Sequence, residues 1–441
     1  MSVIEKTIEL SQDINVTSWL DQHRQQARNE VAAMIMPQRK TEHWLNTPVT
    51  RVLNTLIEQS AIKRLDPEEL KSCYQIDGLD ARTLVFVDGE LQPTLSDMDD
   101  KDDCQLTSFA QASDAQRDLI IEKLDSVFSL AQNKYDHLFA WQNSSLVKDG
   151  VLLVVPKNVR LQRPIRIVHV ATEGSRIALP VHRVICLLES GAEASVIEHF
   201  VAPGQARESF TNNLTEISLA DNSRLKHFRL SLESNDAVAI SGVHVALHRA
   251  ATYESFSIGL GGACKRTDIN VTHLGEGGHC ELKGVYLPKG KQHIDYHTCI
   301  EHSVPHCTTD EIFRGIMADE SRAVFNGRIH IHPDAQKTFA ELSNKNLLLS
   351  PKAEVYTKPE LEIYADDVRC AHGATVSQID DKALYYMQSR GISRKEAEVM
   401  LSFGFINELI EQINIEPLVT LLKPLLANVF VKDSELKRHI L

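Results

Sequence analysis

The middle of the chain is a succession of short apolar runs with the character of β-strands. Between residues 146 and 370, runs such as VLLVVP, RVICLLE, AISGVHVALH and AVFNGRIHIH recur about every 10 to 16 residues, with Gly, Asn, Asp or Pro between them. No helical period interrupts these runs. A doubly wound fold needs helical crossovers between its parallel strands, so the pattern excludes that fold. The spacing predicts a β-solenoid, a sandwich or a barrel without choosing among them.

The two ends of the chain have a different pattern. Residues 1–145 read as helical or mixed, and Ser113 with Gln116 forms a capping box that opens a helix. Residues 380–441 read as helical again. We therefore predict three regions: 1–145, a β core over 146–379, and 380–441.

The C-terminal region has a clear amphipathic pattern. Ser393 and Glu396 form a second capping box, after which apolar residues recur at steps of three and four. These residues are Ala397, Met400, Leu401, Phe405 and Leu409. Pro417 and Pro424 are expected to bound one last apolar helix. The apolar face has two open uses: it covers the end of the β array, or it docks a partner.

Composition narrows the functional classes. The chain of 441 residues has a net charge of −13 and is 43% hydrophobic, so we expect neither nucleic acid nor an anionic membrane as a partner. No run approaches the roughly 20 apolar residues of a membrane span, and the first residues lack the pattern of a signal peptide. Eight cysteines without a CxxC pair suit reduced thiols. We expect a cytoplasmic protein.

Five short motifs between residues 335 and 392 are similar in sequence and in order to those of a known protein family. AQKT, KNLLLS, KPELEIYADDV, CAHGAT and SRGI occur in this order, and the chain thereby resembles the SufB/SufD family of iron–sulfur cluster assembly scaffolds. Residues 139–171 and 36–48 are similar to further segments of that family. Gly373 favours the SufD branch, because SufB-like chains usually have Glu there. Leu45 with Asn46, and Ser377, depart from the family pattern in local detail.

The resemblance implies a fold and a role. The fold is a right-handed parallel β-helix flanked by the two helical regions. The role is that of a non-catalytic, SufD-like scaffold subunit, which pairs with a SufB-like paralogue and an ABC-type ATPase and supports cluster formation and iron acquisition. The helical region around Ala397, Met400, Leu401 and Phe405 is then the ATPase-docking surface. A homodimer through the paralogue surface is an expected state of the isolated chain.

Cys370 and His372 are the sharpest chemical candidates. They lie two residues apart in CAHGAT, so in a strand both side chains project from one face, where thiolate and imidazole suit a soft metal or a nascent cluster. A buried cysteine beside a hydrogen-bonded histidine is the alternative. By resemblance, the pair takes part in cluster assembly at the paralogue interface. We expect no firmly bound cofactor, only a transient iron–sulfur cluster or iron, with reduced flavin at the level of the complex.

A second group of potential ligands lies between His273 and His332. His293 and His297 share a strand face, as do His330 and His332, and cysteines and further histidines lie nearby in sequence: Cys280, Cys299, His302, His306 and Cys307. Their spacing matches no known zinc signature, and ordinary strand histidines are the favoured interpretation.

Enzymatic alternatives have little support in the sequence. There is no Walker phosphate loop and no GxSxG elbow, and GLGGAC, residues 259–264, is interpreted as a turn. The runner-up function is a polysaccharide-acting β-helix enzyme that uses Asp366 with Asp367 or Asp380 with Asp381. Adjacent residues of a strand face opposite ways, which argues against such a pair.

Overall fold

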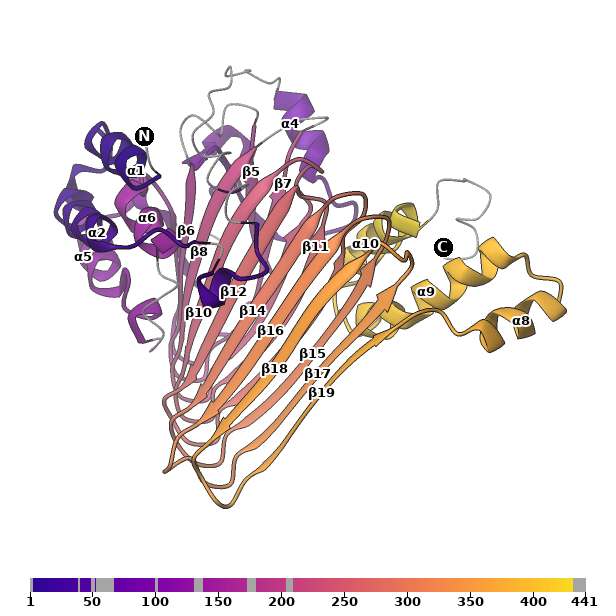
Figure 1. Ribbon diagram of the computed structural model, residues 1–441. Coiled ribbons are helices and arrows are strands. Elements are labelled where there is room, and N and C mark those ends of the chain that lie inside the picture. The colour runs from indigo at the N-terminus through magenta and orange to yellow at the C-terminus, as the bar shows by residue number, and fades with distance from the viewer. Residues whose placement is uncertain are drawn as a thin grey trace.

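The structure is a computed structural model that describes residues 3–38, 40–48, 52, 67–99, 102–130, 138–172, 180–203 and 209–430. Two long sheets dominate it (Figure 1). Successive strands of the chain alternate between the sheets, and within each sheet the strands of neighbouring coils pair in parallel. The predicted mainly β class and parallel β-solenoid are confirmed.

Sheet A has the order β19-β17-β15-β13-β11-β9-β7-β5-β1-β2. Its strands are β1 (Arg82–Val87), β2 (Glu90–Leu91), β5 (Ile165–Val170), β7 (Glu193–Val201), β9 (Arg224–Ser231), β11 (Thr252–Leu260), β13 (His279–Leu287), β15 (Thr308–Met317), β17 (Phe339–Leu348) and β19 (Arg369–Ser377).

Sheet B has the order β18-β16-β14-β12-β10-β8-β6-β4-β3. Its strands are β3 (Gln105–Ser108), β4 (Val151–Val155), β6 (Val181–Leu188), β8 (Phe210–Leu219), β10 (Val238–Leu247), β12 (Cys264–His273), β14 (His293–His302), β16 (Arg322–Ile331) and β18 (Glu354–Ile363).

Helices precede and follow the solenoid. The α-helices are α1 (Val3–Gln12), α2 (Asp21–Ala33), α4 (Pro67–Tyr74), α5 (Asp114–Lys123), α6 (Leu138–Leu146), α8 (Asp381–Ser389), α9 (Arg394–Ile410) and α10 (Glu416–Phe430). Short 3-10 helices span Ser18–Leu20, Glu42–Trp44, Pro93–Leu95, Phe109–Gln111 and Phe128–Leu130. Both predicted capping boxes, at Ser113 and at Ser393, are present.

Apolar clusters explain how these parts pack. Inward-facing side chains of both sheets form the interior of the solenoid, among them Val243, Tyr286 and Phe325. The helices α1, α2, α5 and α6 cover the outer face of sheet B. On the outer face of sheet A, α4 packs against β1, β5 and β7, and α9 and α10 cover later strands. Figure 1 shows α9 and α10 on the opposite side of the strands from α1, α2, α5 and α6. The β core predicted from 146 to 379 also takes in β1 and β3 from the N-terminal region.

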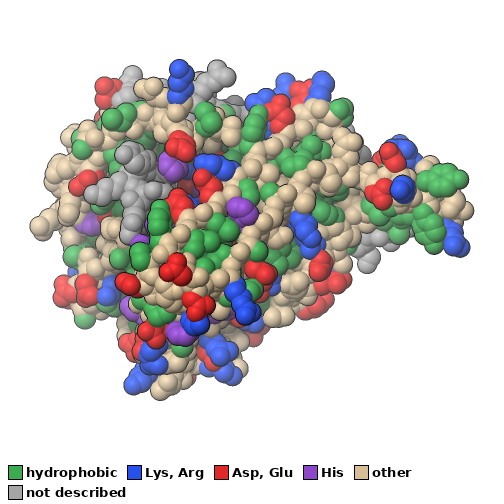
Figure 2. Space-filling model, turned by 60° about the horizontal axis from the view of Figure 1, so that its bottom comes forward, with side chains coloured by type: hydrophobic (Ala, Val, Ile, Leu, Met, Phe, Trp, Pro, Cys, Tyr) green, Lys and Arg blue, Asp and Glu red, His purple; other side chains and the backbone are tan. Residues whose placement is uncertain are grey.

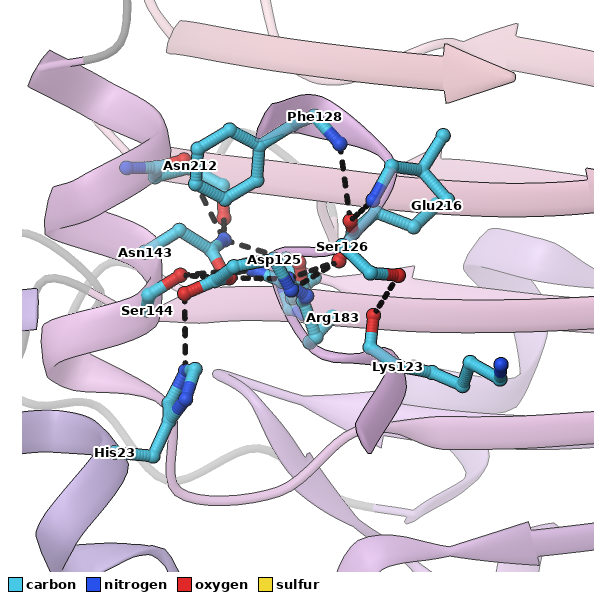
Figure 3. A network of polar contacts seen from close by, with 12 residues as sticks. His23, Lys123, Asp125, Ser126, Phe128, Asn143, Ser144, Arg183, Asn212 and Glu216 are labelled. Carbon is cyan, nitrogen blue, oxygen red and sulfur yellow. Dashed lines mark hydrogen bonds and ion pairs between the residues drawn. The ribbon is translucent and has the colours of Figure 1, made fainter. Parts of the chain in front are cut away.

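A buried polar network fixes the N-terminal region to sheet B (Figure 3). Arg183 of β6 is fully buried and donates to Asp125 at 2.7 Å and to the carboxylate of Glu216. Glu216 also accepts the backbone N–H of Phe128 at 3.1 Å, while His23 lies 3.2 Å from Asp125. Burial raises the pKa of Asp125, but the charges of Arg183 and His23 outweigh it and lower that pKa to about 2.

Candidate functional site

The last coil of the solenoid is open. β18 pairs with β16, and β19 pairs with β17, and neither has a second strand neighbour among the described residues. Most positions of β19 are exposed and β18 has no buried position, in contrast to β16, whose residues are mostly buried. Large apolar side chains are exposed in and beside these two strands: Tyr356, Ile363, Tyr364 and Val376. This open coil offers both an unpaired backbone edge and apolar surface.

Cys370 and His372 lie on β19 in this open coil. They pair in register with Ala340 and Leu342, whose side chains belong to the interior of the solenoid, so both residues continue an interior-facing column. Cys370 is half-buried against that interior, whereas His372 is exposed. Partial burial raises the pKa of the Cys370 thiol, and a hydrogen bond with the backbone of Ala340 opposes part of that rise. The predicted shared face is therefore present.

The pair does not form a complete metal site within this chain. Among the described residues, neither Cys370 nor His372 belongs to a group of three or more potential ligands whose donor atoms lie together. Two protein ligands at an open edge leave half of a tetrahedral coordination shell to other donors. A metal or cluster held there needs ligands from a second molecule or from sulfide.

The four predicted ATPase-docking residues divide between two roles. Ala397 is fully buried, and Phe405 packs with the cluster that joins α9 to sheet A. Arg314 of β15 donates to the backbone oxygen of Phe405 at 2.7 Å. Leu401 is half-buried, and Met400 is exposed. Most of the apolar face of α9 is therefore used within the chain, and Met400 remains on the surface.

The C-terminal helices do not cover the open coil. α9 contacts β13 and β15, and its residues Ile406, Leu409 and Ile410 pack on the outer face of sheet A. The capping interpretation is thus wrong, because an amphipathic pattern does not specify which apolar surface it meets. The predicted boundary at Pro424 is also wrong: α10 continues through it. Packing on sheet A by residues on both sides of Pro424, such as Leu422 and Leu426, outweighs one lost backbone hydrogen bond.

Exposed apolar side chains gather beyond this packed face. Tyr385 and Tyr386 of α8 are exposed at 75% and 59%, and Met400 lies on the neighbouring helix. Figure 2 shows hydrophobic side chains on the part of the molecule that projects at the right, where Figure 1 has α8 and α9. We name Tyr385, Tyr386 and Met400 the projecting patch.

The histidine-rich stretch separates into distinct places. His297 forms an ion pair with Asp295 at 3.0 Å. One group of donor atoms joins Glu301, His330 and His332, and a second joins residues of different coils, His273, His302 and Cys307. The sequence pattern named His330 and His332 as sharing a face, which their stacked rings, 4.4 Å apart, show. It did not bring together His273, His302 and Cys307.

The acidic pairs of the runner-up function have structural roles. Asp367 is exposed and forms an ion pair with Lys337. Asp380 is the N-cap of α8 and accepts the backbone N–H of Lys382 at 2.9 Å. In the glycine-rich segment 259–264, residues 261–263 connect β11 to β12, as expected for a turn, while Gly259 and Leu260 end β11 and Cys264 begins β12.

Comparison with protein-family models decides the family. Residues 169–405 match the SufBD core domain of SUF system FeS cluster assembly, and residues 7–167 match the SufBD protein N-terminal region. The chain belongs to the SufB/SufD family. The core match includes the open coil with Cys370 and His372, and it ends inside α9.

Individual relatives support the SufD branch of the SufB/SufD family. The chain is 32% identical to the iron–sulfur cluster assembly protein SufD of Escherichia coli, over 87% of this chain and 86% of that protein. It is 27% identical to SufD of Bacillus subtilis, over 90% and 91%. Protein ABCI7, chloroplastic, of Arabidopsis thaliana is 28% identical over 85% of this chain and 79% of that protein. The predicted family and branch are confirmed.

The SufB/SufD chain has no membrane-spanning candidate in its described part. None of the described helices combines the length and the apolar character needed to cross a bilayer.

Proposed function

We propose that this chain is a non-catalytic scaffold subunit of a cytoplasmic iron–sulfur cluster assembly complex. In this proposal it pairs with a SufB-like paralogue through the open coil and captures an ABC-type ATPase with its C-terminal helices. The observation that carries the proposal is the open coil itself, where unpaired strand edges, exposed apolar side chains and the Cys370–His372 pair occur together. The names of its relatives as assembly proteins support a role without catalysis.

Pairing through β18 and β19 satisfies two needs at once. An exposed strand edge presents N–H and C=O groups that a second strand can satisfy, and a related solenoid has matching strand spacing. Ile363 and Val376 would lose contact with water in the same step. The same surface allows a homodimer of the isolated chain, because a self-complementary patch pairs with its own copy.

The pairing surface is tested with Val376→Lys in a co-expressed pair of this chain and its SufB-like paralogue. A lysine at the edge should reduce the paired fraction, measured by size-exclusion chromatography with light scattering, because its charge resists burial. Ile35→Lys is the matched control, since Ile35 is an exposed apolar residue of the N-terminal region. Equal pairing by the two variants would contradict this surface.

The projecting patch supports ATPase capture. Its three side chains are apolar or aromatic and exposed on two neighbouring helices, the arrangement that a partner groove can hold. Phe405 is a poor test position, because its ring lies 5.8 Å from the Arg314 guanidinium and packs on the solenoid. A charge introduced at Phe405 would destabilise the fold, so a loss of ATPase binding would not report on the docking surface alone.

A double variant, Tyr385→Asp with Met400→Asp, isolates the patch. It should abolish co-purification of the ATPase while the melting temperature stays within a few degrees of the wild type, since both positions are exposed. Ile121→Asp on α5 serves as control, because Ile121 is an exposed apolar residue on a different helix. Retained capture by the folded double variant would refute the docking surface.

Cys370 and His372 are proposed to act on the nascent cluster at the paired edge. His372 is exposed, so His372→Ala should change the free energy of unfolding by less than about 0.5 kcal/mol. Cluster yield on the anaerobic complex should nevertheless fall, as it should for Cys370→Ser. Arg369→Ala, on the same strand, should keep the yield. Wild-type yields from both site variants would exclude the pair from cluster formation.

Reduced flavin is proposed to bind at the level of the complex. Flavin analysis of the complex and of the isolated chain, both purified anaerobically, tests this. Stoichiometric flavin on the isolated chain would contradict it.

A further inference from the structure

A buried corner of the solenoid brings two histidines and a cysteine together. His273 ends β12 and pairs in register with His302, which ends β14 one coil later. Their rings stack with centroids 4.4 Å apart, and Cys307 lies in the loop that leads from β14 to β15. One nitrogen of each ring and the Cys307 sulfur all lie within 4.8 Å of one another. All three residues are fully buried.

The ring nitrogens of this corner have unequal partners. The hydroxyl of Thr309 lies 3.4 Å from Nε2 of His273 and 3.0 Å from Nε2 of His302. The Nδ1 atoms of both rings are buried and have no hydrogen-bond partner among the described residues. Burial lowers the pKa of His302 to about 3 and that of His273 well below its usual value, so both rings are neutral.

The Thr309 hydroxyl determines which ring nitrogens of His273 and His302 carry lone pairs. A hydroxyl oxygen can accept two hydrogen bonds, so Thr309 can accept the Nε2–H of both rings. Each Nδ1 then carries a lone pair and no proton. A histidine that binds a metal typically donates its other ring N–H to a fixed acceptor in this way. Two buried nitrogens without partners, on rings whose centroids lie 4.4 Å apart, call for such a ligand.

The surroundings of the sulfur fit the same ligand. Burial raises the pKa of the Cys307 thiol, while hydrogen bonds with the backbone of Gly278 and Gly277 oppose part of that rise. The thiol donates to the backbone oxygens of Gly275 and Pro305, each at 3.5 Å, and gives up these bonds when a metal displaces its proton. Gly278 also leaves space at His273, because a Cβ at that position would lie 2.8 Å from Nδ1. The loop therefore supplies both donors to the sulfur and room beside the ring.

We propose that His273, His302 and Cys307 bind one divalent transition-metal ion of borderline softness, such as Zn²⁺ or Fe²⁺. Two imidazoles and a thiolate suit such ions, and three protein ligands leave a fourth position for water or another donor. Binding displaces the thiol proton of Cys307 to solvent. This site is separate from Cys370 and His372 and does not depend on the proposed pairing.

The outer cluster at the same corner is a weaker competitor. Glu301, His330 and His332 also bring their donor atoms together, at the surface of sheet B. However, the guanidinium of Arg328 lies 2.7 Å from Nδ1 of His330 and 3.0 Å from Glu301. Arginine only donates, so it occupies the His330 lone pair, and its charge repels a cation. This cluster is an ion-pair network and supplies control positions.

Cobalt(II) is the probe for the buried site. Metal-stripped full-length chain, titrated anaerobically with Co²⁺, should bind one equivalent and develop the near-ultraviolet absorption of a cobalt–thiolate bond. Folded Cys307→Ser should lose that absorption. Cys370→Ser, and the double variant His330→Ala with His332→Ala, should keep it. Persistence in folded Cys307→Ser, loss in Cys370→Ser, or no absorption in the wild type would overturn the proposal.

A second variant keeps the test decisive if Cys307→Ser fails to fold. Thr309→Val preserves the shape of the side chain and removes the acceptor shared by His273 and His302. Loss of such an acceptor typically weakens metal affinity about 10- to 100-fold. We expect a Kd for Co²⁺ that rises by that factor, with the thiolate absorption retained at saturation. An unchanged Kd would refute the proposed site.

Discussion

Replacing Arg183 by methionine should destabilise the protein through two stranded carboxylates. Arg183 is fully buried, and its guanidinium lies between Asp125, at 2.7 Å, and Glu216. Breaking a buried ion pair by removing one partner typically costs about 3 to 5 kcal/mol. Glu216 keeps backbone N–H donors, among them that of Phe128 at 3.1 Å, and Asp125 keeps His23. We therefore expect the lower value, about 3 kcal/mol.

Urea unfolding at pH 7 measures this cost from the shift of the midpoint. Arg117→Met is the matched control, because Arg117 pairs with Asp114 on the exposed surface of α5, and its loss should cost less than about 0.5 kcal/mol. Arg183→Met with Glu216→Gln should recover part of the lost stability, since one uncompensated charge is removed. A cost for Arg183→Met as small as that of Arg117→Met would refute the reasoning.

The difference in stability between Arg183→Met and the wild type should depend on pH, and the pKa shifts of Asp125 and Glu216 give its sign. In the wild type the pKa of Asp125 is lowered from 3.8 to about 2, so its contribution is present above about pH 4 and is lost as pH falls toward 2. Burial already raises the pKa of Glu216 in the wild type, and without Arg183 it also leaves the folded pKa of Asp125 above the unfolded value. The Arg183→Met variant therefore loses stability as pH rises and these buried carboxyls ionise. The difference in stability between variant and wild type should narrow between pH 7 and pH 4.

Two further predictions concern the interior of the solenoid. Gly284→Ala should cost about 1 to 3 kcal/mol, because the new Cβ would lie 2.2 Å from Phe313, while Gly373→Ala, with nothing within 4 Å, should leave the urea midpoint nearly unchanged. Equal midpoints would contradict this packing. Burial raises the pKa of Glu311 from 4.5 to about 8, so wild-type stability falls as pH rises through that range. Glu311→Gln removes this loss, so the stability of the variant minus that of the wild type should be larger at pH 8 than at pH 5. An equal stability difference at the two pH values would contradict the raised pKa of Glu311.

The strands were predictable because each apolar run is local. Runs such as RVICLLE and AVFNGRIHIH form β6 and β16, and both capping boxes follow from pairs of residues three positions apart. The stacking of those strands into coils came from the family resemblance, since strand spacing alone fits several β architectures. Neither the strand pattern nor the family resemblance predicted that β19 would be an unpaired edge, because a strand's own sequence does not say whether a further strand pairs with it.

The partners of the helices and ligands were not predictable from local pattern. The spacing of Ala397 and Leu409 predicts a helix with one apolar face, but that face looks the same whether it meets sheet A or another protein. His273 and His302 are separated by one coil, and only the register of β12 and β14 makes them neighbours. A search for ligand residues one coil apart would have found them.

The two ends of the solenoid differ in a way that gives its assembly a direction. At the N-terminal end the sheets finish in β2 and β3, which run antiparallel to their neighbours, whereas β18 and β19 leave the other end open. From β5 onward each strand pairs with one made a single coil earlier, so a chain leaving the ribosome can add coils to a template already folded. Synthesis halted after any coil would leave a fresh edge, resembling the natural one but without Cys370 and His372.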